Sequence, residues 1–156
     1  MSADAPGRRP LVLGVGNVLM GDEGVGVHAV RRLEATDLAA KADFLDGGTG
    51  GFHLLGSFDG RERIILIDAA MDGRPPGTVT LLRPRFASDF PRSLSAHDIG
   101  LRDLVESASL LGSLPRIDLV TVSVAELQPM TIELSPAVAG ALDKVDMAVR
   151  DLIETF

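Results

Sequence analysis

The sequence predicts an α/β fold: a three-layer αβα sandwich whose mostly parallel, twisted five-stranded sheet carries helices on both faces. Two observations support this prediction. Short, continuously apolar runs such as residues 11–15 and 64–67 indicate strands that are buried on both faces. These runs alternate with segments in which apolar residues recur every three or four positions, as they do in amphipathic helices.

Length and composition agree with one folded unit. The 156 residues suit a single domain, and a hydrophobic content of 46% excludes a disordered chain. We expect a flexible tail at residues 1–9, which are polar and contain Gly and Pro, and one domain at residues 10–156. The absence of cysteine excludes disulfides, thiolate metal sites and cysteine nucleophiles.

The first half of the chain predicts three strands and two helices. The apolar run 11–15 is the first strand, and Val27, Val30 and Leu33 recur at about one turn in a helix over residues 25–35. A short second strand at 42–45 enters a glycine-dense segment, and Thr49 is a suitable N-cap for a short helix over 52–58. The apolar run 63–67 is the third strand.

The second half predicts two more strands and two helices. Residues 78–82 alternate well enough to be an edge strand or a hairpin partner. The irregular segment 83–96 is predicted to be a surface loop of a length that is often functional. A helical stripe follows over 101–111, then a strand at 117–124. Ser135 and Pro136 provide a helix start, from which a stripe runs to Leu152. The element order is therefore β-α-β-α-β-β-α-β-α.

Four polar residues are predicted at one edge of the sheet. Glu23 follows the first strand, Asp46 follows the second, Asp68 ends the third, and His97 lies in the long loop before a helix. Sites in open α/β sheets lie outside the carboxyl ends of the strands. These four residues are therefore the candidate site, although they are far apart in the sequence.

The chemistry of Glu23, Asp68 and His97 is that of a metal site. Carboxylate oxygens and an imidazole nitrogen can together bind Zn²⁺, Ni²⁺ or Fe²⁺ with positions left open for a substrate. Each residue also has an ordinary alternative: a helix N-terminal acid, a strand-end cap or a surface histidine. Asp46 either orients the glycine loop at 47–51 through backbone N–H groups or assists the site directly, and we favour the first role.

The other candidates receive structural roles. Asp22 is expected to shape the loop beside Glu23, and the glycines around this pair give room for backbone and for a bulky metal-bearing partner. His28 and His53 lie inside predicted helices and are expected to be packing or surface residues. Met130 is expected to be an ordinary loop or core methionine.

Other kinds of site fit poorly. The segment Gly14-Val15-Gly16 follows a strand, but Leu19 stands where a dinucleotide fingerprint needs its third glycine, and no Walker A pattern occurs. A net charge of −7 argues against nucleic acid as a partner, and no apolar run is long enough for a membrane span. Without a secretory signal, a cytoplasmic protein is expected.

These motifs resemble a known family. The segments Leu13-Gly14-Val15-Gly16-Asn17, Asp22-Glu23-Gly24 and Asp46-Gly47-Gly48-Thr49 are similar to those of the hydrogenase maturation endopeptidases. The likeness continues through Ile67-Asp68-Ala69 and through the run from Ser95 to Leu101, which includes His97, and it covers almost the whole chain from Leu11 onward.

The resemblance implies a function. An enzyme of this family removes the C-terminal extension from the large-subunit precursor of a nickel–iron hydrogenase after nickel insertion, and its metal-contacting residues fall on Glu23, Asp68 and His97. Nickel would be a recognition element carried by the substrate and not a resident cofactor, because a site without cysteine supplies only the harder O and N ligands. The general base stays open between Asp46, Asp68 and another carboxylate, and a monomer is expected.

Two alternatives from other classes remain at this point. A peptidyl-tRNA hydrolase also begins with a strand and Gly-x-Gly-Asn, but it would carry a further histidine-asparagine element and a basic face, which this sequence lacks. A non-catalytic ligand-binding α/β module is the second alternative. It would release no peptide from a nickel-loaded precursor.

Overall fold

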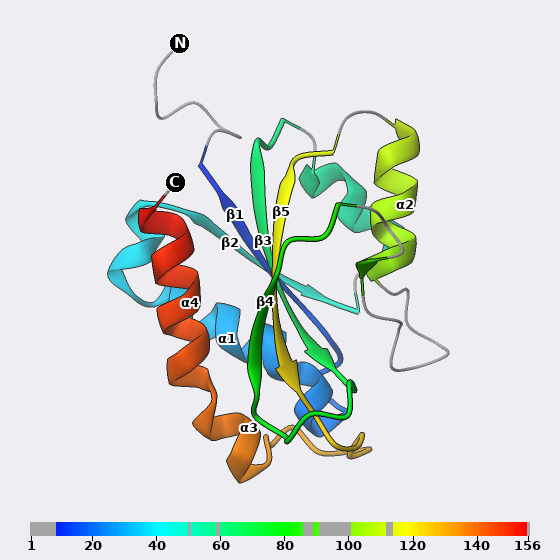
Figure 1. Ribbon diagram of the computed structural model, residues 1–156, viewed down its shortest axis with the longest axis vertical. Coiled ribbons are helices and arrows are strands. Elements are labelled where there is room, and N and C mark those ends of the chain that lie inside the picture. Colours follow the sequence, from blue (N-terminus) through cyan, green and yellow to red (C-terminus); the bar gives the residue numbers. More distant parts are fainter. Residues whose placement is uncertain are drawn as a thin grey trace.

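Five strands form one sheet in the order β2-β1-β3-β5-β4 (Figure 1). The computed structural model describes residues 9–49, 51–58, 60–85, 89–90, 101–111 and 114–155, without the side chains of 51–53 and 111. The strands are β1 (Leu11–Val15), β2 (Asp43–Gly48), β3 (Arg63–Ala70), β4 (Val79–Leu82) and β5 (Arg116–Ser123). Four of them are parallel and β4 is an antiparallel edge strand beside β5, which confirms the predicted sheet.

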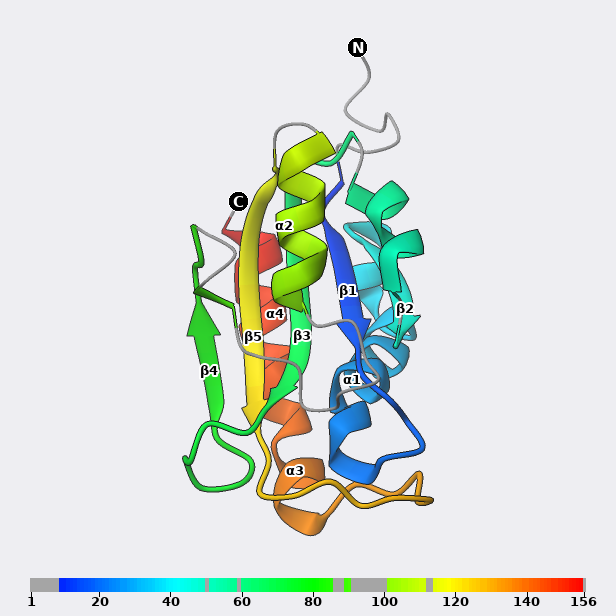
Figure 2. The same ribbon diagram turned by 90° about the vertical axis from the view of Figure 1, so that its right-hand side faces the viewer.

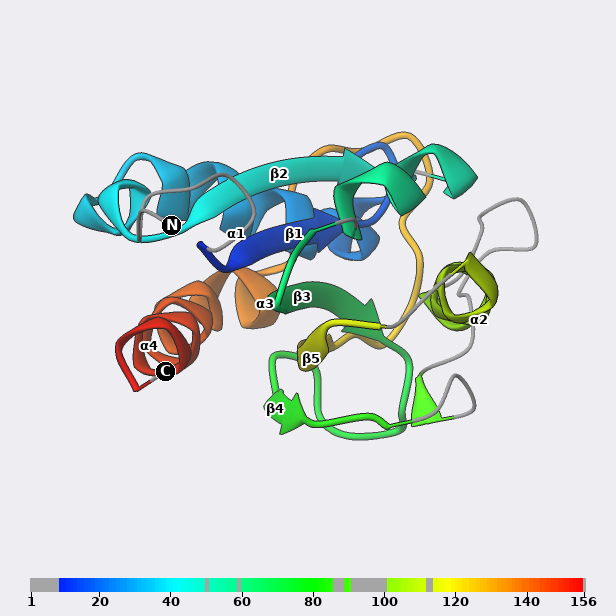
Figure 3. The same cartoon turned by 90° about the horizontal axis from the view of Figure 1, so that it is seen from above.

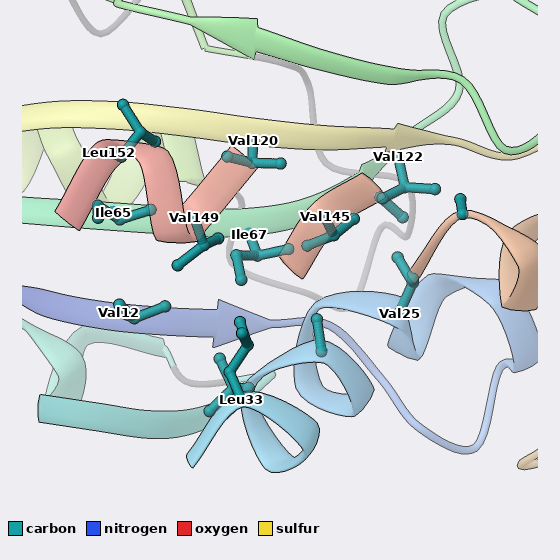
Figure 4. Packing of buried hydrophobic residues seen from close by; sticks show 14 of the residues in the cluster. Val12, Val25, Leu33, Ile65, Ile67, Val120, Val122, Val145, Val149 and Leu152 are labelled. Atoms are coloured by element: carbon teal, nitrogen blue, oxygen red, sulfur yellow. The ribbon is translucent and has the colours of Figure 1, made fainter. Parts of the chain in front are cut away.

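Helices cover both faces of the sheet, as the sequence predicts (Figure 3). On one face, α1 (Val25–Glu34), α3 (Pro136–Gly140) and α4 (Leu142–Glu154) pack on strand residues such as Val12, Ile65 and Val120 (Figure 4). On the other face, the 3₁₀ helix η3 (Gly51–Phe58) and α2 (Leu101–Leu111) pack on Leu13, Leu66 and their neighbours. Alternate residues of each strand thus enter two separate cores, because successive side chains point to opposite faces.

Two strands are longer than predicted. We expected strands at 42–45 and 63–67, but β2 continues through Asp46 to Gly48 and β3 continues through Asp68 to Ala70. The reason is pairing with neighbouring strands: Asp46 is in register with Gly14 of β1, and Asp68 is in register with Thr121 of β5. Neither aspartate therefore follows or ends its strand, although both lie near the carboxyl end.

The closing helix is divided. We expected one helix from Pro136, but α3 ends at Gly140 and α4 begins at Leu142. Ala141 donates its N–H to the carbonyl of Val138 at 3.0 Å, the tighter hydrogen bond of a 3₁₀ turn. Glycine at position 140 weakens the helix where this turn occurs. Two short 3₁₀ helices, η1 (Gly21–Gly24) and η2 (Asp37–Ala40), were not predicted.

The chain's first described residue is tied to the fold. Arg9 donates to the carbonyl of Ala42 at 3.0 Å, and its own carbonyl accepts from Arg61 at 3.0 Å. Residues 1–8 of the expected tail lie outside the described part, so the division into a tail at 1–9 and a domain at 10–156 stays a prediction. Among the described residues, no helix is both long and apolar enough to cross a membrane.

Candidate functional site at the carboxyl edge of the sheet

The acidic loop folds back onto the strand that precedes it. After β1 the chain passes through Gly16, which has a φ of +140°, and returns through η1, which carries Asp22 and Glu23, to the start of α1. A Cβ atom at Gly16 would lie 2.0 Å from the carbonyl oxygen of Glu23. Glycine is therefore required here by the close approach of the chain's own backbone, as well as by its φ angle.

A second glycine brings the loop to β3. A Cβ atom at Gly26, in the first turn of α1, would lie 2.2 Å from the carbonyl oxygen of Ile67. Ile67 directly precedes Asp68, and Gly26 follows Glu23 by three residues. The glycines thus give room to backbone, as expected, and at positions 16 and 26 that room is filled by this chain and not by a partner.

Glu23 and Asp68 lie at the same edge of the sheet. Glu23 is 5% exposed, and η1 packs directly against β3, where Asp68 is half-buried. One carboxylate oxygen of Asp68 accepts the backbone N–H of Ala69 at 2.8 Å. Because a buried carboxylate is costly in free energy, two carboxylates on packed elements at one edge of a sheet are typical of a functional site.

Strand alternation places Asp68 on a particular face. Ile64 and Leu66 belong to the core beneath η3 and α2, and Asp68 continues their alternation. α2 begins with Leu101 at its end nearer the carboxyl ends of the strands and runs back along the sheet (Figure 2). His97 precedes this helix by four residues in the sequence, but it lies outside the described residues.

Asp22 is a structural residue, as expected. Its side chain is buried; one carboxylate oxygen accepts the N–H of Ser135 at 2.7 Å and the other accepts from the amide of Gln128 at 3.0 Å. The same Gln128 accepts the backbone N–H of Asp22 at 2.9 Å. Asp22 therefore fastens the acidic loop to the segment between β5 and α3, a structural role that it does not share with Glu23 in any of these three hydrogen bonds.

Gln128 and Ser135 had no predicted role. They lie 106 and 113 residues from Asp22, and no local pattern marks either of them as its partner. The contact depends on how the chain returns to the carboxyl edge after β5. Ser135, expected to be an N-cap, does stand before α3, but its side chain makes no capping hydrogen bond.

Asp46 is held by its neighbours. One carboxylate oxygen accepts two hydrogen bonds from the Arg31 guanidinium, at 2.9 and 3.2 Å, and the other accepts the N–H of Gly48 at 3.0 Å. The bond to Gly48 confirms the expected contact with a backbone N–H of the glycine segment. Both oxygens are engaged, so Asp46 is the weaker candidate for a general base.

Of the three histidines, only His28 has a side chain within the described residues. His28 is half-buried in α1, and its Nε2 atom has no hydrogen-bond partner in the part of the chain described here. The side chain of His53 lies outside the described residues. Within the described residues, no group of three His, Asp or Glu side chains is arranged for a metal ion, and with His97 outside them the predicted set of three stays untested.

Comparison with known proteins identifies the family. The family model described as hydrogenase maturation protease matches residues 27–151 of this chain. The chain belongs to the hydrogenase maturation protease family. It is accordingly a peptidase of hydrogenase maturation. The family therefore excludes the two alternatives, a peptidyl-tRNA hydrolase and a non-catalytic ligand-binding module.

Relatives match along most of their length. The chain is 37% identical to the hydrogenase 2 maturation protease of Escherichia coli K12 over 151 residues, which is 92% of each chain. It is 40% identical to the hydrogenase expression/formation protein HupD of Rhodobacter capsulatus over 149 residues, 92% of this chain and 71% of that protein. The solved maturating endopeptidase HybD from E. coli superimposes with a TM-score of 0.75 at 37% identity, covering 92% of this chain and 93% of the other.

Proposed function

We propose that this chain removes the C-terminal extension from the large-subunit precursor of a nickel–iron hydrogenase, once nickel is in place. The observation that carries the proposal is the position of Glu23 and Asp68 in a member of this family. The close approach of Gly26 to Ile67 and the packing of η1 on β3 place the loop of Glu23 against the β3 segment of Asp68, at the edge where α/β enzymes bind their ligands.

Nickel enters this proposal as part of the substrate. Glu23, Asp68 and His97 contact the nickel ion of the precursor and so position one peptide bond at the carboxyl edge. Oxygen and nitrogen ligands suit an ion that already has thiolates from its own protein. The chain itself has no cysteine with which to hold such an ion permanently.

Asp68 is the better of the two candidates for the general base. A base must accept a proton from the attacking water, directly or through one further water. Asp68 lies on β3, the strand against which η1 and its Glu23 pack, whereas Asp46 lies on β2 and both of its oxygens accept hydrogen bonds, from Arg31 and from Gly48. We therefore assign Asp68 to water activation or nickel contact, and Asp46 to the shape of the glycine segment.

The test is processing of a purified precursor. Nickel-loaded large-subunit precursor mixed with the native chain should become shorter, with the released C-terminal peptide identified by mass spectrometry; nickel-free precursor should stay uncut. Glu23→Gln, Asp68→Asn and His97→Ala should each reduce the cleavage rate by at least about 10²-fold, a typical loss when one group of a preorganised site is removed.

Matched controls separate the site from the surface. Glu34→Gln and Asp103→Asn change exposed carboxylates elsewhere. His53→Ala removes a histidine that we place outside the site. All three should cleave at the native rate, and all six variants should keep the native circular dichroism spectrum. Normal processing by Glu23→Gln and His97→Ala would overturn the assignment of these residues.

A chelator experiment tests the role of nickel. The native chain treated with EDTA and then desalted should cleave the nickel-loaded precursor at an unchanged rate. A rate that falls and returns only when nickel is added to the chain would show a resident metal instead.

A further inference from the structure

Three exposed apolar side chains lie together beside the acidic loop. Leu19, Met130 and Ile132 are 57%, 91% and 61% exposed. We call these three residues the apolar rim. Leu19 belongs to the loop after β1, whereas Met130 and Ile132 belong to the segment between β5 and α3.

Hydrogen bonds hold the two segments of the apolar rim side by side. Thr131, between the two rim residues of its segment, donates its N–H to the carbonyl of Leu19 at 3.2 Å and accepts the N–H of Gly21 at 2.8 Å. Figures 1 and 2 show the two loops adjacent at the carboxyl end of the sheet. The contacts of Asp22 with Gln128 and Ser135 fasten the same two segments within the chain.

Met130 has a backbone conformation that its side chain does not favour. Its φ is +62°, and it is the one non-glycine residue with positive φ among those the structure describes. The left-handed region costs an L-residue with a Cβ about 1–2 kcal/mol, and Gly or Asn is the usual choice there. At 91% exposure this methionine gains no packing within the chain in return.

Other exposed large apolar residues in the described part of the chain are distributed over the surface. Met71 follows β3, Leu81 lies on the edge strand β4, Leu110 lies in α2, and Met147 lies in α4. Isolated exposed apolar residues of this kind are normal. Three that converge from two segments, next to the loop of Glu23, require an explanation.

We propose that the apolar rim is the docking surface for an apolar segment of the large-subunit precursor next to the bond that is cleaved. This inference rests on the proposed function, because the precursor must present that bond at the edge where Glu23 lies. Glu23 donates its N–H to the carbonyl of Met20, the residue that follows Leu19, so the rim adjoins the backbone of Glu23. Methionine suits such a surface, since its flexible, polarisable side chain adapts to its partner.

A second copy of this chain is a poorer occupant. It would cover the edge through which the precursor must approach. The net charge of −7 also opposes self-association at low salt, because like charges repel. A precursor segment with apolar side chains meets neither obstacle.

The experiment compares rim and control variants in the processing assay. The triple variant Leu19→Ser, Met130→Gly, Ile132→Ser should raise KM for the nickel-loaded precursor at least about tenfold, with little change in kcat. Calorimetry with uncleaved precursor should show the same loss of affinity. The control Leu110→Ser, Met147→Ser removes equally exposed apolar side chains elsewhere and should leave KM unchanged.

The single variant Met130→Gly separates docking from folding. Glycine accepts positive φ without strain, so this variant should unfold at the same temperature as the native chain or a higher one while its KM rises. If KM and affinity are unchanged in the triple variant, the docking surface is overturned and the proposed function is not. The same conclusion follows if the native chain forms a dimer and the triple variant is a monomer. A native chain that binds precursor without cleaving it overturns the proposed function alone, and one that does neither overturns both.

Discussion

At the scale of single residues, two adjacent acids have different roles. Asp22 and Glu23 are both buried, but the carboxylate of Asp22 is used entirely within the chain, by Gln128 and the N–H of Ser135. Glu23 stands at the same edge of the sheet as Asp68. The roles differ because one side of the loop meets the returning chain and the other meets β3.

Asp22→Ala tests this division. It should lower the free energy of unfolding by roughly 3 kcal/mol, because it leaves the part-buried donors of Gln128 and Ser135 without their acceptor. Urea unfolding followed by circular dichroism measures the loss. Glu23→Gln serves as the comparison: we expect its cleavage of the precursor to be lost and its free energy of unfolding to stay close to that of the native chain. An Asp22→Ala chain of native stability that does not cleave would place Asp22 in the site instead.

At the scale of elements, close contact between α1 and β3 shapes the site. The α1 backbone at Gly26 approaches the β3 carbonyl of Ile67 too closely for any Cβ atom. η1, which carries Glu23, leads directly into α1. The packing of α1 on β3 therefore sets the separation of Glu23 from Asp68. A change in that packing changes the position of one acid relative to the other.

Gly26→Ala should show this coupling. The added methyl group has to displace α1 from β3, which should cost about 1–3 kcal/mol of stability. Because the displacement also moves Glu23, cleavage should fall by roughly 10²-fold at a temperature where the variant is still folded. Gly140→Ala is the matched control: nothing lies within 4 Å of a Cβ there, so it should keep full activity and gain slightly in stability. Full activity in a folded Gly26→Ala would contradict the coupling.

At the scale of the whole molecule, two carboxylates, Asp37 in η2 and Asp146 in α4, change the stability of the fold in opposite directions as the pH falls. A hydrogen-bonded ion pair with Arg150 lowers the pKa of Asp37 below its usual value. Burial raises the pKa of Asp146 above its usual value, although Arg32 lies 2.8 Å from it and opposes that shift. Stability from Asp37 is present above the usual aspartate pKa and is lost as the pH falls. Asp146 destabilises the fold as the pH rises and it ionises.

Asp146→Asn should therefore gain in stability, relative to the native chain, as the pH rises from below the usual aspartate pKa to neutral. At low pH both side chains are neutral, whereas at neutral pH only the native chain carries the partly buried charge. Thermal unfolding of both chains across this range measures the difference in Tm. Asp37→Asn should show the reverse trend, and equal trends for the two variants would contradict the assignment.

Much of the fold could be predicted because it depends on local patterns. Continuous apolar runs indicate doubly covered strands, and the stripe through Val27, Val30 and Leu33 indicates a helix with one buried face. The α/β class, five mostly parallel strands and the edge position of β4 are all confirmed. Strand ends were less predictable, since β2 and β3 continue as far as their neighbours offer hydrogen bonds, past Asp46 and Asp68.

The sequence by itself determined the class of fold, the family and the edge at which Glu23 and Asp68 lie, because apolar periodicity and short motifs are local properties. Only the tertiary structure decided how the acidic loop is held. Three features join segments that are far apart in the chain: the contact of Gly26 with Ile67, the hydrogen bonds of Asp22 with Gln128 and Ser135, and the apolar rim. Such contacts exist only after β1, β3 and β5 take their places in the sheet. The stretch that begins at Leu11 shows which acids are present, and the folded chain shows that Asp22 is the one that binds the segment between β5 and α3.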